Sequence, residues 1–147
     1  MATTTATISL SSSDLLTDNL SLSSTMNLYK GGTTATGLDQ FRMERFKIAT
    51  GTQFDLIEAT TAATEDANYV YIINKNTDPT HYVIVSIYDV VIGRLYAGDW
   101  MWMPWDADVV AVGAGGSAIE VQAFVAEATI EYCLFHNGET RSTSDDS

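Results

Sequence analysis

Apolar and polar residues alternate along most of the chain with a period of two, which predicts β-strands rather than helices. Between residues 5 and 10, apolar side chains at every second position alternate with threonine and serine. Residues 20–28 repeat this pattern, and their apolar positions are Leu20, Leu22, Met26 and Leu28. Each segment is expected to form a half-buried strand. Between them, Ser12 is expected to cap one short helical turn, because a serine oxygen accepts hydrogen bonds from free backbone donors.

Further segments rich in β-branched and aromatic residues predict the remaining strands. They span residues 41–48, 54–57, 68–74, 81–88, 90–96, 100–105, 118–125 and 128–135. The polar run 75–80 contains Pro79 and is predicted to close a hairpin between the strands on either side of it. No amphipathic helical segment is visible. We therefore expect an all-β fold, a single β-sandwich or jelly-roll-like domain with an extended N-terminal arm.

The chain divides into three parts by composition. Its 147 residues suit one domain with a single core. We expect a Ser/Thr-rich N-terminal arm with one or two strands over residues 1–37 and a sandwich core over residues 38–137. A polar, acidic C-terminal tail is expected over residues 138–147.

Charge is distributed unevenly between these parts. Residues 1–50 carry four basic and four acidic groups, whereas residues 51–147 carry three basic groups and fifteen acids, which gives the net charge of −12. An acidic surface repels nucleic acid, so no nucleic-acid partner is expected. The basic residues Arg42, Arg45 and Lys47 are interpreted as a docking stripe for another acidic protein, or alternatively as a solvated strand face.

No membrane segment is expected, because no apolar run approaches the roughly 20 residues that a spanning helix needs. The first residues lack the basic-then-apolar order of a secretory signal, so synthesis in a cytoplasm is expected.

The sequence contains no pattern typical of a catalytic, cofactor or metal site. Cys133 is the single cysteine and is interpreted as a plain strand thiol. The glycines of residues 113–116 lack the Lys-Ser/Thr ending of a phosphate loop. Asp106 and Asp108 do not follow the calcium-loop spacing and are interpreted as an exposed turn. We therefore assign no catalytic residue, cofactor or metal, and do not expect an enzyme.

The segment 100–105 has the most distinctive composition. In a strand, Trp100 and Trp102 share one face, and Met101 and Met103 share the other. Both faces are apolar, so we expect the core to cover one and a neighbouring subunit to cover the other, since Trp and Met are enriched in interfaces. Two alternatives stay open, that these residues fill one core or that the tryptophans stack on sugars. The candidate interface comprises Leu20, Leu22, Met26, Leu28, Arg42, Arg45, Lys47, Trp100, Trp102 and Trp105.

Three segments of the chain resemble small β-sandwich virion proteins of tailed bacteriophages, a group that includes capsid decoration (cement) proteins. These segments read LSLSST (residues 20–25), LYAGDWMWMPW (95–105) and ATIEYCLF (128–135). The resemblance implies a virion assembly protein, made in the host cytoplasm and often a homotrimer, which binds major capsid protein or other virion proteins. It implies no catalytic residue.

The expected function is that of a capsid decoration protein whose N-terminal arm adds a strand to, or lies along, the major capsid protein. Binding only the assembled shell would stabilise it by mass action. One alternative is a tail or head-tail component, such as an adaptor, knob or fibre base. The other is a carbohydrate-binding module that uses exposed tryptophans.

Overall fold

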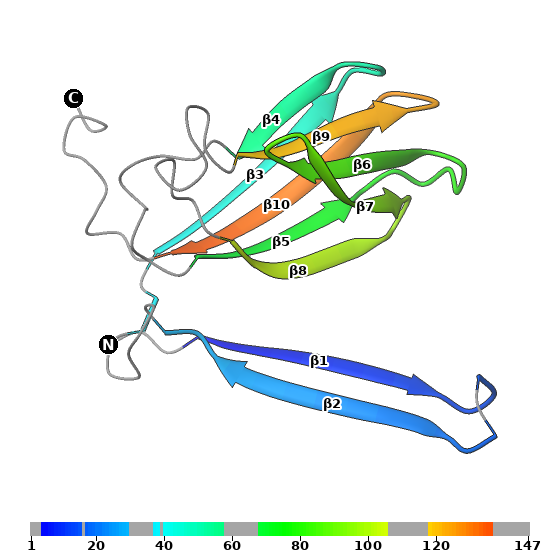
Figure 1. Cartoon of the computed structure of the whole chain (residues 1–147), viewed down its shortest axis with the longest axis vertical. Coiled ribbons are helices and arrows are strands. Elements are labelled where there is room, and N and C mark those ends of the chain that lie inside the picture. The colour runs from blue at the N-terminus through cyan, green and yellow to red at the C-terminus, as the bar shows by residue number, and fades with distance from the viewer. Residues whose placement is uncertain are drawn as a thin grey trace.

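The computed structural model describes residues 4–15, 17–29, 37–38, 40–57, 68–105 and 118–136. These residues form ten strands and no helix, which confirms the all-β prediction (Figure 1). The strands are β1 (Thr5–Ser12), β2 (Leu20–Asn27), β3 (Gln40–Ile48), β4 (Gln53–Ile57), β5 (Asn68–Asn74), β6 (Tyr82–Ile87), β7 (Val90–Tyr96), β8 (Trp100–Trp105), β9 (Ile119–Phe124) and β10 (Ala128–His136). The C-terminal tail expected over residues 138–147 lies outside the described residues.

Strands β3 to β10 form two four-stranded antiparallel sheets stacked as a sandwich (Figure 1). One sheet has the order β3-β10-β5-β8 and the other has the order β4-β9-β6-β7. The antiparallel pairs β3/β10, β4/β9, β5/β8 and β6/β7 are nested in the sequence, with β6/β7 innermost. This nesting is the strand order of a jelly roll, so the predicted fold class is confirmed.

The predicted hairpin across residues 75–80 is wrong. Strand β5 pairs with β10 and β8, whereas β6 pairs with β7 and β9, so the segment between β5 and β6 crosses from one sheet to the other. Side-chain bonds hold this crossing in place. The Asn76 side-chain oxygen accepts from the Thr129 backbone N–H at 2.9 Å, and the Asn76 amide donates to the Glu127 carbonyl at 3.1 Å.

The tight hairpin of the sandwich instead joins β6 to β7. Its two turn residues, Tyr88 and Asp89, have φ angles of 49° and 63°. Two-residue hairpin turns favour this left-handed backbone because it matches the twist of the strands, and glycine or asparagine usually supplies it. The residue pair Tyr-Asp gave no such signal in the sequence.

Alternation within the strands divides the core from the surface as the sequence pattern predicts. In β10, Ala128, Ile130, Tyr132 and Leu134 are buried, while Thr129 and Glu131 lie on the opposite face. The core between the sheets consists of Ile48, Leu56, Ile57, Val70, Ile72, Val83, Val85, Leu95, Trp105, Ile119, Val121, Ala123, Ala128, Ile130, Tyr132 and Leu134.

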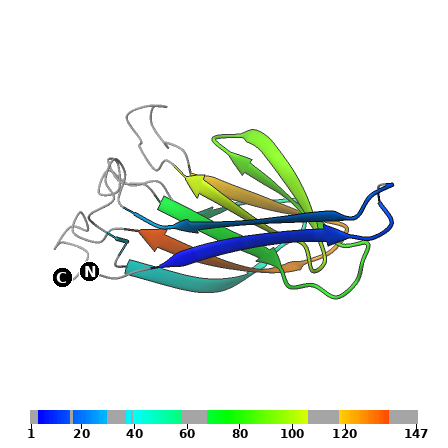
Figure 2. The ribbon, with the colours of Figure 1, turned by 90° about the horizontal axis from the view of Figure 1, so that it is seen from below.

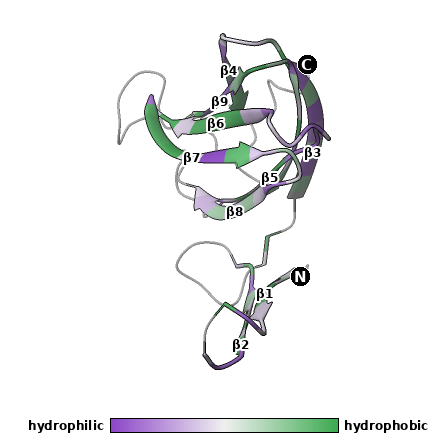
Figure 3. Cartoon of the chain, turned by 90° about the vertical axis from the view of Figure 1, so that its right-hand side faces the viewer, coloured by the Kyte–Doolittle hydropathy of each residue, from purple (hydrophilic) through white to green (hydrophobic). Residues whose placement is uncertain are grey.

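Strands β1 and β2 form a separate two-stranded hairpin ahead of the sandwich. It runs along the length of the sandwich in Figure 2, and in the end-on view of Figure 3 it lies on the side of β8. The predicted helical turn after Ser12 is wrong for the described residues, because Ser12 pairs with Leu20 and the chain reverses direction between them. The Ser12 hydroxyl oxygen nevertheless accepts a hydrogen bond from the Leu15 backbone N–H at 3.1 Å.

Candidate functional site

One face of the sandwich is aromatic and exposed. It is the outer face of the β3-β10-β5-β8 sheet, and we call it the aromatic face. The residues that the strand register places on it are Phe41, Met43, Arg45, Lys47, Tyr69, Tyr71, Ile73, Trp100, Trp102, Pro104, Thr129, Glu131, Cys133 and Phe135. Phe41, Met43 and Trp100 are each more than half exposed. Apolar exposure on this scale, gathered on one sheet face, is typical of an interaction surface.

The rings of the aromatic face pack against one another and form a continuous band across all four strands. The ring centroids of Tyr69 and Trp102 are 5.6 Å apart, those of Trp102 and Phe135 are 5.7 Å apart, and those of Phe135 and Phe41 are 5.1 Å apart. Such aromatic pairs stabilise by about 0.5–1.5 kcal/mol each beyond the area they bury. The band is therefore a preorganised platform rather than a set of independent side chains.

The hairpin carries a second apolar surface. Cross-strand pairing puts Ile8, Leu10, Leu20, Leu22 and Met26 on one side of it, and we call this set the apolar stripe. The exposed fractions of Ile8, Leu10, Leu22 and Met26 lie between 41% and 49%. The other side is polar, with Thr7 and Thr25 hydrogen-bonded at 3.0 Å. Because a lone two-stranded hairpin is only marginally stable, the apolar stripe needs a partner surface.

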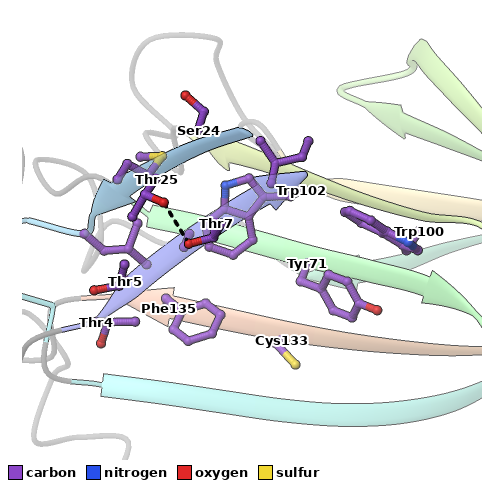
Figure 4. A pocket seen from close by; sticks show the side chains of 14 residues that line it. Thr4, Thr5, Thr7, Ser24, Thr25, Tyr71, Trp100, Trp102, Cys133 and Phe135 are labelled. Carbon is purple, nitrogen blue, oxygen red and sulfur yellow. Dashed lines mark hydrogen bonds between the residues drawn. The ribbon is translucent and has the colours of Figure 1, made fainter. Parts of the chain in front are cut away.

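A groove of about 430 Å³ lies between the hairpin and the aromatic face (Figure 4). The hairpin contributes residues near its root, including Ile8, Thr25 and Met26, and the sheet contributes Tyr71, Trp100, Trp102, Cys133 and Phe135. Burial, followed by the charge of Glu131, raises the pKa of the Cys133 thiol. A protonated thiol is a poor nucleophile, and the rest of the lining is apolar side chains with threonine and serine hydroxyls from the hairpin.

The basic stripe predicted on residues 42–47 is only partly formed. Arg45 and Lys47 lie on the aromatic face, and each already pairs with a carboxylate, Glu131 at 2.6 Å and Glu127 at 3.3 Å. Arg42 lies on the other face of β3, because its position differs from theirs by an odd number of residues. Its guanidinium carbon is 5.8 Å from the centroid of the Tyr132 ring.

The side chains of β8 alternate between the two faces of the sheet as predicted, and this alternation also determines where the third tryptophan lies. Trp100 and Trp102 share the aromatic face, while Met101 and Met103 pack against the core. Trp105 falls on the methionine side and is 5% exposed, so it belongs to the core. Leu28 is likewise buried, with 1% exposed. Neither Trp105 nor Leu28 offers an exposed surface in the single chain.

Several residues of the aromatic face were not predicted as candidates. Phe41, Met43, Tyr69, Tyr71 and Phe135 join Trp100 and Trp102 only because β3, β10, β5 and β8 are neighbours in the sheet. A sequence signal existed in β3, where large apolar side chains occupy positions of the same parity as the exposed basic residues. The pairing of distant strands carried no such signal.

The opposite sheet holds a buried carboxylate that the sequence did not reveal. Glu120 is 8% exposed, and its carboxylate accepts hydrogen bonds from the Gln53 side-chain amide and from the Asp89 backbone N–H. Burial is the main cause that raises the pKa of Glu120, and the charges of Asp89 and Asp55 raise it further. Within the part of the chain that the structure describes, no three potential metal ligands are grouped together.

The substitution Glu120→Gln is expected to raise the free energy of unfolding at neutral pH. It removes a buried charge beside two other carboxylates, yet keeps an oxygen that accepts from Gln53 and Asp89. Because the folded pKa is raised, the gain is full above that pKa and disappears below the ordinary value of 4.5. Urea unfolding at several pH values measures this. A lower stability of the variant at pH 7 would contradict it.

Ionisation of the buried Tyr132 is expected to lower the stability of the fold at high pH. Its hydroxyl donates to the Glu44 carboxylate at 2.7 Å, and burial, together with this bond, raises the pKa of Tyr132 from 10.0 to about 12. Since the folded state favours the neutral phenol, stability from this group is present below pH 10 and is lost as the pH rises through 12.

The substitution Tyr132→Phe is therefore expected to lower the free energy of unfolding by about 1 kcal/mol at pH 8, through loss of one hydrogen bond. The difference from the wild type should shrink between pH 10 and pH 12. Urea unfolding followed by circular dichroism over this range checks it. A difference that grows with pH would show that Tyr132 ionises more easily in the folded chain than in the unfolded one.

Comparisons with known proteins add no relative. No family model, no curated protein and no solved structure matches the chain. None of the described residues forms a helix with the length and apolar character needed to cross a membrane.

Proposed function

We propose that the chain is a structural virion protein of a bacteriophage, a capsid decoration protein that binds the major capsid protein of the assembled shell. The observation that carries this proposal is that two apolar surfaces, the aromatic face and the apolar stripe, are exposed in a chain with a net charge of −12. A surface of this kind fits protein partners. Jelly rolls serve in viral capsids but also in lectins, so the fold alone does not decide the function.

The mechanism is stabilisation by selective binding. A protein that binds the assembled shell, and not its free or unfolded subunits, raises the free energy needed to open the shell. The outer half of the hairpin, with Leu10, Leu22 and the 70% exposed Leu15, supplies the apolar contact with the shell. The acidic sandwich faces solvent, where its charge resists random association.

The number of copies per particle tests this proposal. Quantitative mass spectrometry of purified virions should find the chain in hundreds of copies if it decorates the shell. A dozen copies or fewer would move it to the tail or the head-tail junction, as an adaptor, knob or fibre base. Absence from the particle would reject the proposal.

We propose no enzymatic role. The residues that line the groove include no carboxylate, histidine or lysine, and the thiol of Cys133 has a raised pKa. General acid-base or nucleophilic catalysis needs such groups within reach of a substrate.

A second candidate function is glycan binding, and the composition of the groove favours it. Trp100, which is 51% exposed, lines the groove together with Tyr71 and with threonine hydroxyls from the hairpin. Aromatic faces beside hydroxyls suit the alternating apolar and polar surface of a sugar. Intrinsic fluorescence during titration with oligosaccharides separates the two functions. A saturable shift that Trp100→Ala abolishes would favour the glycan function, and a flat response would reject it.

A further inference from the structure

We propose that copies of this chain assemble by hairpin exchange, in which the β1–β2 hairpin of one copy packs against the aromatic face of the next, in the place of that copy's own hairpin. This inference deepens the proposed function, on which it rests for the homo-oligomeric unit. It names the occupant of the groove as a second copy of the same chain.

The hairpin covers the aromatic face incompletely within one chain. The strands β1 and β2 hydrogen-bond only to each other among the described strands. Ile8 and Met26 line the groove, yet each remains 41% exposed. A void of about 430 Å³ is far larger than the gaps of a close-packed protein interior. The hairpin and the face match in chemistry but do not pack tightly within a single copy.

The way in which the hairpin is attached also favours exchange. The root of the hairpin is tied by the Leu38 backbone N–H, which donates to the Leu28 carbonyl at 3.4 Å, and by a bridge between Tyr29 and Gly37. Only one residue then separates Leu38 from the start of β3 at Gln40. A different direction of the hairpin would break no strand pair of the sandwich, because β1 and β2 pair only with each other among the described strands. Exchange of an identical element through such a junction is a low-cost route to an oligomer.

Charge limits which surfaces of two copies can meet. Two copies with a net charge of −12 each repel one another over most of their surfaces. The described part of the hairpin carries two acids, Asp14 and Asp18, and no basic residue. On the aromatic face Arg45 pairs with Glu131 and Lys47 pairs with Glu127, so its charges balance. The acidic hairpin therefore meets a neutral, apolar face, whereas the opposite sheet carries Asp55, Asp89 and the buried Glu120 against one base, Arg94.

Cysteine cross-linking between two distinguishable chains tests the exchange, because the native Cys133 lies in the groove. One chain carries Met26→Cys with Cys133→Ser, and the other is the wild-type chain with a mass tag. Neither chain can cross-link within itself. After mixing, unfolding and refolding together, a short bismaleimide should join the two chains with a yield near the statistical limit that random mixing of the two chains allows. The control carries Ser23→Cys with Cys133→Ser, and should cross-link far less because Ser23 does not line the groove.

A second variant tests for cross-linking within a single copy. A single chain with Met26→Cys and the native Cys133 reports whether the two positions meet within one copy. If this chain cross-links only within itself, and the mixed chains do not cross-link although circular dichroism shows them folded, the exchange is refuted. Shell binding is measured separately on virions, so the exchange and the proposed function fail independently of each other.

Discussion

Serine in place of both Leu10 and Leu22 is expected to weaken binding to the assembled shell by about two orders of magnitude. The two leucines are directly opposite one another in the hairpin, and each is about half exposed in the free chain. Burying the rest of each side chain against a partner contributes about 1–1.5 kcal/mol. A combined loss of about 3 kcal/mol corresponds to roughly a hundredfold weaker binding. Co-sedimentation with shells stripped of the protein measures this.

The matched control changes Ser9 and Ser23, which are also directly opposite one another but lie on the polar side of the hairpin. Alanine at both positions should leave shell binding within a few-fold of the wild type. Both double variants should keep the unfolding midpoint of the sandwich, because the hairpin shares no strand pair with it. Equal loss of binding in the two variants would contradict a role for the apolar stripe.

Alanine substitution of the two tryptophans at the ends of β8 is expected to lower stability strongly at one position and hardly at the other. Trp105 is 5% exposed and part of the core, so Trp105→Ala should lower the free energy of unfolding by about 3–5 kcal/mol. Trp100 is 51% exposed and its ring centroid is 5.9 Å from that of Tyr71 on the neighbouring strand, so Trp100→Ala should leave the stability nearly unchanged. Urea unfolding followed by far-ultraviolet circular dichroism compares them.

Although Trp100→Ala should hardly change stability, it is expected to weaken association between copies of the chain. A tryptophan that becomes buried at an interface typically contributes 2 kcal/mol or more, so Trp100→Ala should weaken association at least tenfold. The conservative variant Trp100→Phe should restore part of it. If Trp100→Ala unfolds the chain while association of the folded fraction is unaffected, the exposed ring is structural and the aromatic face is not an interface.

Most strands of this fold were predictable, because each carries its own local signal. Alternation located β1, β2 and β10, and β-branched composition located β5, β6 and β7. Which strands pair with one another was harder to predict from the sequence. The crossing between β5 and β6 and the turn at Tyr88 and Asp89 are decided by tertiary packing, which overrides the weak turn signals of the sequence.

The sequence predicts which residues lie on the candidate surface wherever counting alternate positions within one strand is enough to assign each side chain to a face. Counting positions along β8 separates Trp100 and Trp102 from Trp105, and the same count along β3 separates Arg42 from Arg45 and Lys47. Nothing local indicates that Phe41 and Phe135 meet, or that Trp102 stacks on Tyr69. Those contacts depend on which distant strands become neighbours, and that is a property of the jelly-roll order.

We propose that other protein chains cover the aromatic face and the apolar stripe, and the mass of the purified protein in solution tests whether they do. Light scattering coupled to size exclusion, at low and high protein concentration, should give a stable oligomer of the 16.0 kDa chain, with a trimer as the expected state. A 16.0 kDa monomer at every concentration would contradict association between copies and would leave the aromatic face to a different ligand.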